Sequence, residues 1–136
     1  MGARKRLRAE KIKAENKTKI FASLKDNPTS PRKMRLVADL VRGNEVNSAL
    51  DVLAFAPQEA ARKLRKLVLS AISNWEKKND GVRIEDANLY IKEIAVDSAR
   101  VLKRLRPAPQ GRGYRVRKRS NHVTVILDSK KQNISE

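Results

Sequence analysis

Few side chains in this 136-residue chain have types and spacings that could do chemistry. Glu85, Asp86, Glu93 and Asp97 are the acidic grouping nearest to a strongly basic stretch, and such carboxylates could bind the divalent metal ion of a nuclease. Pairing with neighbouring Arg and Lys is the simpler role for them. His122 is the single histidine. Because no nucleophile or acid partner for it is evident, a neutral histidine that is hydrogen-bonded in a sheet or touches RNA is a better interpretation than a general base.

Other catalytic and cofactor motifs are also missing from the sequence. The absence of cysteine excludes disulfides and thiol catalysis, and no zinc-ligand spacing occurs. Gly111 and Gly113 lack the strand-to-helix setting of a nucleotide-binding loop. No apolar run approaches the roughly 20 residues that span a bilayer, and the basic start has no apolar signal segment behind it. We therefore expect no catalytic residue, metal or cofactor, no membrane, and a cytoplasmic location.

The positive charge is concentrated in two stretches of the chain. Of a formal net charge of +17, residues 1–19 carry +6, since they hold eight basic and two acidic side chains. Residues 98–127 add +9 and contain no Asp or Glu, which leaves only +2 for the remainder. A protein that threads among phosphates concentrates charge on extensions in this way. The pattern predicts a polyanionic partner, and nucleic acid is the first candidate.

The remaining residues predict the body of one domain. Residues 19–25 alternate as a short strand, with Ile20, Ala22 and Leu24 on one side. A helix should begin at Pro31 behind Ser30 as N-cap and end before Gly43. Its expected core positions are Met34, Val37, Leu40 and Val41.

Two further helices follow in the sequence. The first runs from about residue 45 to 54, with Val46, Ala49, Leu50 and Leu53 inward. The second is the most regular segment and ends near Lys78, with Trp75 in phase with its apolar stripe and therefore in the core. That stripe consists of Ala60, Ala61, Leu64, Leu67, Val68, Ala71, Ile72 and Trp75. The opposite face, with Arg62, Lys63, Arg65 and Lys66, is expected to be a solvated face rather than a binding site, with an RNA-facing role as the alternative.

The first turn of the helix after Ser30 has an unfavourable charge. Arg32 and Lys33 lie where the helix dipole already presents positive charge. An external anion would stabilise this arrangement, and a phosphate at a helix N-terminus is a common solution.

A turn at residues 79–81 and an extended chain from Ile84 follow. Leu89 and Ile91 alternate in one phase and Ile94 and Val96 in the other, which predicts a β-bulge near Lys92 and Glu93.

The basic stretch should form a two-stranded ribbon, because Val123, Val125 and Leu127 alternate on its return side. Pairing should stop before Pro107 and Pro109 and resume after Gly113. Limbs of about ten residues would reach on the order of 30 Å. Arg115, Arg117 and Arg119 would share one face at about 7 Å spacing, which suits successive phosphates. Val101, Leu105 and Val116 would be exposed on such an arm.

The fold class we predict is α+β, with a three-stranded antiparallel sheet packed with three helices. To this body belong residues 19–97 and 120–128. Residues 1–18 form a basic extension, residues 98–119 a protruding hairpin arm with its tip at 106–113, and residues 129–136 a flexible tail.

Three stretches carry a family likeness. Residues 30–43 are SPRKMRLVADLVRG, residues 70–74 are SAISN, and residues 103–125 are KRLRPAPQGRGYRVRKRSNHVTV. In this order, over about residues 19–127, they resemble the L twenty-two family of large-ribosomal-subunit proteins, bacterial type. The pattern departs from many members at Ala108 and Pro109, where Arg and Ala are common.

The resemblance implies a structural role in the large subunit. A member would bind several domains of the large-subunit rRNA, support assembly, and extend its hairpin to the wall of the nascent-peptide exit tunnel, near a constriction and the macrolide-binding region. Partners would be that rRNA, neighbouring ribosomal proteins and the nascent polypeptide, with the protein a monomer within the particle.

Charge, position and the resemblance together define the candidate site. By matching position, the resemblance places Lys103, Arg104, Arg106, Pro107, Gly111 and Arg112 near the tip, and Arg117, Lys118, Arg119 and His122 on the return limb. The expected rRNA-binding residues are Ser30, Arg32, Lys33, Arg35, Arg100, Lys103, Arg104, Arg106, Arg112, Arg115, Arg117, Lys118, Arg119 and His122. The expected tunnel-tip residues are Arg106, Pro107, Ala108, Pro109, Gln110, Gly111 and Arg112.

Two other classes of protein remain as alternatives. The nearer one is an architectural DNA-binding protein, whose β-ribbon arms with proline wedges kink a duplex. Such proteins are usually dimers, and no self-complementary helical interface is evident here. A metal-dependent nuclease would need Glu93 and Asp97 to bind a divalent ion.

Overall fold

The computed structural model describes residues 3–79 and 87–129, and the remaining residues lie outside the described part. Its elements are α1 (Ala3–Thr18), β1 (Ile20–Asn27), α2 (Pro31–Val41), α3 (Val46–Phe55), α4 (Glu59–Lys78), β2 (Leu89–Pro107) and β3 (Gly113–Ser129). The predicted α+β class is confirmed. The basic extension forms a fourth helix, α1, in addition to the three of the body.

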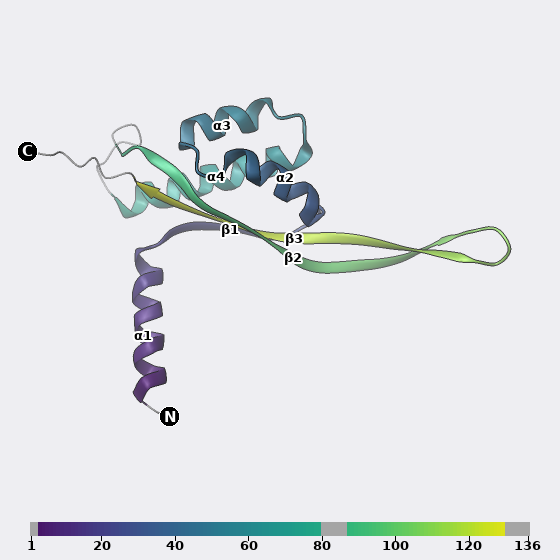
Figure 1. The fold of residues 1–136 in the computed structure, drawn as a ribbon, viewed down its shortest axis with the longest axis horizontal. Helices are drawn as coiled ribbons and strands as arrows, with labels where there is room; N and C mark the ends of the chain where they lie inside the picture. Colours follow the sequence, from purple (N-terminus) through teal and green to yellow (C-terminus); the bar gives the residue numbers. More distant parts are fainter. Residues whose placement is uncertain (1–2, 80–86, 130–136) are drawn as a thin grey trace, which may run out of the picture.

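The sheet is antiparallel, and β3 is its central strand, with β1 on one side and β2 on the other. β1 pairs only with residues 121–127 of β3, whereas β2 pairs with β3 over nearly its whole length. Beyond the end of β1 the other two strands continue alone as a twisted ribbon that projects far from the body (Figure 1). The arm is therefore a direct continuation of two strands of the body's sheet.

The core lies between the sheet and the three body helices, which cover one of its faces (Figure 1). The apolar stripe predicted for α4 is buried along its whole length, and Trp75 is 4% exposed, so its assignment to the core is confirmed. From the sheet, the alternating residues of all three strands point inward. These are Ala22, Leu89, Ile91, Ile94, Val96, Val123, Val125 and Leu127.

One predicted core residue of α2 is wrong. Leu40 is 52% exposed, and Ala38 is fully buried instead. Met34, Val37, Ala38 and Val41 follow the three- and four-residue steps of a single helical stripe, and Leu40 lies outside that arc. Helix geometry, rather than side-chain hydrophobicity, decides which residue faces the sheet.

The ribbon contains two bulges. The first, between Ile91 and Glu93, confirms the bulge predicted from the phase change. The second lies between Ser98 and Val101, where Ala99 and Arg100 together face Ser120. It was not predicted, because no apolar alternation crosses it. Since bulges increase the local twist, this one reorients the ribbon where the arm begins.

Some expectations fall outside the described residues or at their edges. Asp80, Gly81, Ile84, Glu85 and Asp86 lie outside the described part, as do residues 130–136 of the expected tail. β3 continues through Ser129, which pairs with Leu89. α2 begins and ends as predicted, with Ser30 as N-cap, Pro31 in its first turn and Gly43 at a φ of +79° beyond its end.

Candidate nucleic-acid interface

The root of the arm is held by a buried polar network centred on Asn121. The Asn121 side chain is 0% exposed, and its Nδ2 donates to the carbonyl oxygen of Thr29 at 2.6 Å. Its Oδ1 accepts a hydrogen bond from Nδ2 of Asn27 at 3.1 Å. In the ribbon, Asn121 pairs with Ser98, at the start of the second bulge. The network therefore joins β1, the start of α2 and the ribbon at one point.

The cations of the arm occupy both of its faces. Side chains alternate along a strand, so Arg115, Arg117 and Arg119 share one face, as predicted, with Lys103 opposite Arg117 on the neighbouring strand. The other face carries three cations, which are Arg104, Arg106 and Lys118. The ribbon can therefore contact anions on two sides.

Cross-strand pairing separates most of these like charges. Lys103 and Arg117 are the only two cations directly opposite each other in the described pairing of residues 101–119. The other cations face apolar or aromatic residues in the pairs Val101–Arg119, Leu102–Lys118, Arg104–Val116, Leu105–Arg115 and Arg106–Tyr114. Like charges directly opposite each other destabilise a ribbon, whereas long cationic side chains can lie along apolar neighbours. The register thus reduces the self-repulsion of the arm.

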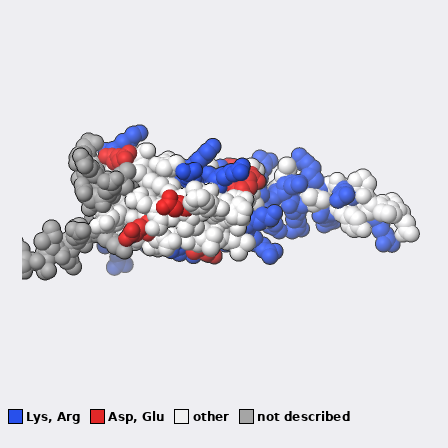
Figure 2. Space-filling model, turned by 90° about the horizontal axis from the view of Figure 1, so that it is seen from above, with Lys and Arg blue, Asp and Glu red and all other residues white. Residues whose placement is uncertain are grey.

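Within the described part of the protein, no acidic side chain pairs with the positive charge of the arm. Among the described residues, no ion pair involves a Lys or Arg of residues 98–119. Lys and Arg gather on the ribbon just beyond the body, while the Asp and Glu visible in this view lie on the body (Figure 2). Leu105 and Tyr114 are well exposed, at 76% and 65%, whereas Val101 and Val116 are half-buried. Such a basic surface, without a hydrophobic core of its own, is suited to binding a polyanion.

The tip is closed by a tight turn. Arg112 N–H donates to the carbonyl oxygen of Pro109 at 3.4 Å, and the two residues between them, Gln110 and Gly111, have φ values of +62° and +68°. Positive φ at both central positions is the mark of a type I′ turn, whose twist matches that of a hairpin. The backbone of Gln110 is thus held in a region that favours glycine or asparagine.

The predicted end of strand pairing at the tip was wrong by one residue on each limb. Pairing continues through Pro107, which faces Gly113. Ala108 N–H donates to the carbonyl oxygen of Arg112 at 2.8 Å. Because successive backbone N–H groups of a strand point to opposite sides, the backbone nitrogen of Pro107 points away from the partner strand. In a ribbon with two free edges, a proline at such a position removes no ladder hydrogen bond.

The start of α2 lies at the arm's root, because Asn121 binds the carbonyl of Thr29. Ser30 is in an extended conformation and makes no side-chain cap, and no acid lies in the first turn. Arg32 and Lys33 are exposed there. This helix end thus lies beside the root of the arm, and the phosphate contact there stays a prediction.

Lys63, expected on the solvated face of α4, instead reaches the start of α2. Its Nζ donates to Oγ1 of Thr29 at 3.1 Å and lies 2.9 Å from Glu59 Oε1. The hydrogen bond from Lys63, followed by the charge of the same group, lowers the pKa of Glu59. A third cation therefore lies beside this helix end.

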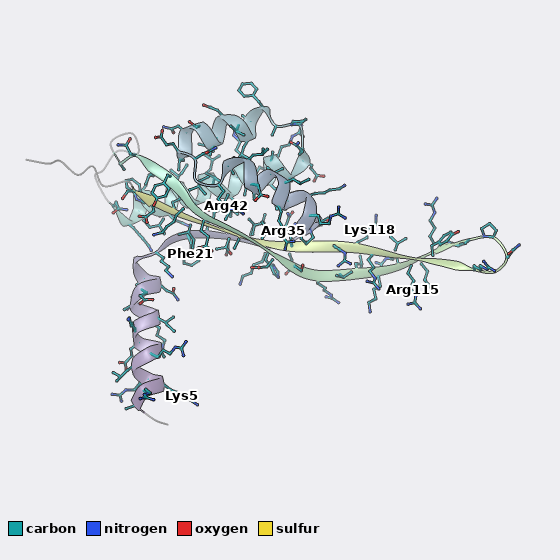
Figure 3. The ribbon with its side chains drawn as sticks, in the orientation of Figure 1. Lys5, Phe21, Arg35, Arg42, Arg115 and Lys118 are labelled. Atoms are coloured by element: carbon teal, nitrogen blue, oxygen red, sulfur yellow. The ribbon has the colours of Figure 1, made fainter. Side chains whose placement is uncertain are left out.

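Arg35 of α2 and Arg42, the residue just after this helix, serve the body as well. Arg35 donates through Nη2 to the carbonyl oxygen of Val96 at 2.9 Å, and Arg42 donates to that of Ile94 at 3.2 Å and to Asp39 (Figure 3). Both carbonyls belong to the free edge of β2. Exposed strand edges invite pairing with other chains, and these two contacts cover part of such an edge. Arg35, predicted to bind rRNA, thus uses one N–H donor of its guanidinium group for a contact inside the protein.

His122 is hydrogen-bonded in the sheet, as predicted. Its Nδ1 accepts from the backbone N–H of Asp26 at 3.0 Å, so in the neutral ring the proton is on Nε2. Nε2 lies 4.0 Å from Oδ1 of Asp26. The ring is partly exposed, which leaves Nε2–H available to a ligand.

The acids of the ribbon are dispersed. Glu93 and Asp97 lie on β2, and the described residues include no group of three or more His, Asp or Glu that could hold a metal ion. Lys92 donates to Asp128 Oδ2 at 2.6 Å, which lowers the pKa of the Asp128 carboxyl and raises that of the Lys92 amine. None of the helices described is both long and apolar enough to span a bilayer.

Two positioning groups were not found from the sequence. Asn121 and Asn27 lie 94 residues apart, and neither has a motif around it that signals burial. Lys78, at the end of α4, donates through Nζ to the carbonyl oxygens of Lys17 and Lys19, at 3.0 and 2.6 Å, and so ties the end of α1 to the body. Such contacts depend on chain-distant backbone groups, which no local pattern reveals.

The fold and this surface together define a class of protein, a small α+β body with a long cationic hairpin and a second basic extension. Comparison with known sequences agrees. Residues 22–128 match the family described as ribosomal protein L22p/L17e. The chain therefore belongs to this family, a family of ribosomal proteins and not of enzymes.

Relatives align over nearly the whole chain. The "Large ribosomal subunit protein uL22" of Flavobacterium johnsoniae is 61% identical over 127 residues, which cover 93% of each chain. The protein of the same description from Bacteroides fragilis is 59% identical over 133 residues, 98% of this chain and 97% of the relative. That of Parabacteroides distasonis is 57% identical over 136 residues, all of this chain and 99% of the relative. The last alignment includes α1.

Proposed function

We propose that this protein is a structural component of the large subunit of the cytoplasmic ribosome and binds large-subunit rRNA through its arm. The supporting observation is the ribbon of residues 98–119, which has cations on both faces, no acid, and no ion pair within the described residues. Membership in a ribosomal-protein family and relatives named for the large subunit support the choice of RNA.

The arm binds by neutralising phosphates. Guanidinium groups two residues apart on a strand are spaced at about 7 Å and can contact successive phosphates. Because the opposite face carries further cations, the ribbon bridges two RNA segments instead of lying on one. Exposed Leu105 and Tyr114 are covered by the same RNA, and Tyr114 can stack on a base.

The tip contributes to the wall of the nascent-peptide exit tunnel. Its type I′ turn is narrow and lies at the far end of the arm from the body (Figure 1). Residues 106–113 would face the passage, and the nascent polypeptide would be a transient partner. Neighbouring ribosomal proteins contact the body, and the protein is a monomer within the particle.

Salt-dependent binding to large-subunit rRNA tests the role of the arm. The logarithm of the binding constant falls as the logarithm of the salt concentration rises. Replacing Arg115, Arg117 and Arg119 by Ala should make this negative slope shallower by about two to three units, since each lost phosphate contact contributes about 0.7–0.9. The matched control replaces Arg62, Arg65 and Lys66, three exposed cations of α4, by Ala. An unchanged slope in the arm variant, or an equal loss in the control, would count against phosphate binding by the arm.

A second assay separates RNA from DNA and tests the tip. At fixed salt, preference for large-subunit rRNA over duplex DNA is expected, and preference for the duplex would favour the architectural DNA-binding alternative. A photoreactive amino acid at Gln110 should crosslink to a stalled nascent chain in purified ribosomes. Crosslinks to rRNA alone would place the tip outside the passage.

A further inference from the structure

The N-terminal helix α1 has no structural role in the body. It projects away from the sheet and from the other helices, with Lys5 near its far end (Figures 1 and 3). In the described part of the chain it packs against no other helix or strand, and residues 3–17 are all exposed. Lys78 holds its end, through hydrogen bonds to the carbonyls of Lys17 and Lys19. The helix is thus presented outward from a fixed base.

α1 is too highly charged to be stable as a free helix. Its 16 residues include seven Lys or Arg and two Glu, a balance of +5. No acid lies in its first turn, where three cations oppose the helix dipole. Arg6 and Glu10 form an exposed ion pair at 3.4 Å, which is worth little. Helices of about this length are marginal in water even without such repulsion, so a bound polyanion would be needed to hold it.

Six of the seven cations of α1 form two opposite stripes, and Lys5 lies between them. At about 100° per residue, Arg4, Arg8 and Lys11 fall within one narrow arc of the helix, which also contains Glu15 at its C-terminal end. A second arc, about half a turn away, contains Arg6, Lys13 and Lys17. The larger apolar residues, Leu7 and Ile12, lie on the two flanks between the stripes, so the helix has no single apolar face.

Two opposite stripes distinguish between possible partners. A lipid surface would need the cations on one side and an apolar face toward the acyl chains. A single phosphate row would be met by one stripe and leave the other unpaired. The major groove of double-stranded RNA is too narrow for a helix of about 10–12 Å diameter, but its minor groove is wide and shallow, with a phosphate backbone on each side, and a helix of about 24 Å length can lie along it.

We infer that α1 is a second RNA-binding element, which lies along the minor groove of double-stranded RNA and neutralises one phosphate backbone with each stripe. This rests on the proposed function, because it takes RNA as the partner, but it uses none of the arm. Lys78 fixes the direction in which α1 leaves the body. The arm and α1 project from the body in different directions, so the protein holds separate RNA segments at once (Figure 1).

The test uses the full-length protein and its salt-dependent binding to large-subunit rRNA. One variant replaces Arg4, Arg8 and Lys11 by Gln, another replaces Arg6, Lys13 and Lys17 by Gln, and a third combines the two. Gln is a good helix former, so circular dichroism should show that the helix remains. Each single-stripe variant should make the negative salt slope shallower by about two to three units, and the combined variant by about twice as much. The control replaces Arg62, Arg65 and Lys66 by Gln, with the same loss of charge.

The possible results separate this inference from the proposed function. If only one stripe lowers the slope, α1 lies on a single backbone and the inference is wrong. If the α4 control lowers it equally, net charge alone explains the effect and the inference is also wrong. If the α1 variants bind like the wild type while the Arg115, Arg117 and Arg119 variant loses slope, the inference fails but the arm's role stands. If no variant loses slope, both fail.

Discussion

Asn121 is expected to stabilise the body out of proportion to its size, because it joins β1, α2 and the ribbon through two buried hydrogen bonds. Asn121→Ala removes both, at about 1 kcal/mol each. It also leaves the amide of Asn27, which is 4% exposed, without its acceptor, at a further cost of about 1–3 kcal/mol. The expected loss in the free energy of unfolding is therefore at least about 3 kcal/mol.

Thermal denaturation followed by circular dichroism measures this loss. For a chain of this length about 3 kcal/mol corresponds to a fall in Tm of about 10 °C. The matched control is Asn44→Ala, which removes one hydrogen bond, at 3.0 Å, from a more exposed amide to the carbonyl of Leu40. Its Tm should fall by about a third as much. A fall for Asn121→Ala no larger than that of the control would refute the reasoning.

The same variant also tests the link between this network and binding. With the root of the arm loosened, affinity for large-subunit rRNA should decrease, because the arm must be ordered on binding. The salt slope should stay the same, since no cation has been removed. A double-mutant cycle with Asn27→Ala should give a coupling energy of about 1 kcal/mol or more, and additive effects would show that the two side chains act independently.

Two further predictions concern the tip and the pH dependence of stability. Gly111→Ala should strain the turn, because φ is +68° there, and should therefore speed hydrogen exchange at the Arg112 amide. Gly113→Ala is the control and should not change the exchange rate, because its new Cβ would meet only the Arg106 carbonyl oxygen, at 4.0 Å. Equal exchange in the two variants would contradict this prediction. Asp128→Asn should lower Tm by an amount that is constant from about pH 5 to 9, since the lowered pKa of Asp128 and the raised pKa of Lys92 keep both groups ionised there. The stabilisation by a carboxylate with a lowered pKa is lost as pH falls through that pKa, so the difference in Tm between the wild type and Asp128→Asn should vanish in strong acid. A Tm difference that persists in strong acid would exclude the ion pair as its source.

Much of this fold could be predicted from periodicity and charge. The apolar stripe of α4 and the phase change at Lys92 are repeated patterns, so local geometry alone decides the outcome. The resemblance over residues 30–43 and 103–125 supplied the family. Leu40 was misplaced because a short helix offers several apolar arcs, and packing against the sheet selects one.

The candidate site was less predictable where it depends on contacts distant in sequence. Nothing local to Asn121 indicates that it binds Thr29, 92 residues away. The bulge at Ala99 and Arg100 has no apolar alternation to reveal it. The opposite stripes of α1 could have been found from helical spacing, but only once residues 3–18 were known to form one helix.

β3 is the middle strand of the body's sheet and also one limb of the arm, without a joint between them. In mechanical terms the arm is a cantilever. A force applied at the free end becomes a bending moment at the clamp, where the body's packed layers and the amide of Asn121 resist it. Stiffness of the projection is thus supplied by the same strand that completes the core, so weakening the core would also make the projection more compliant.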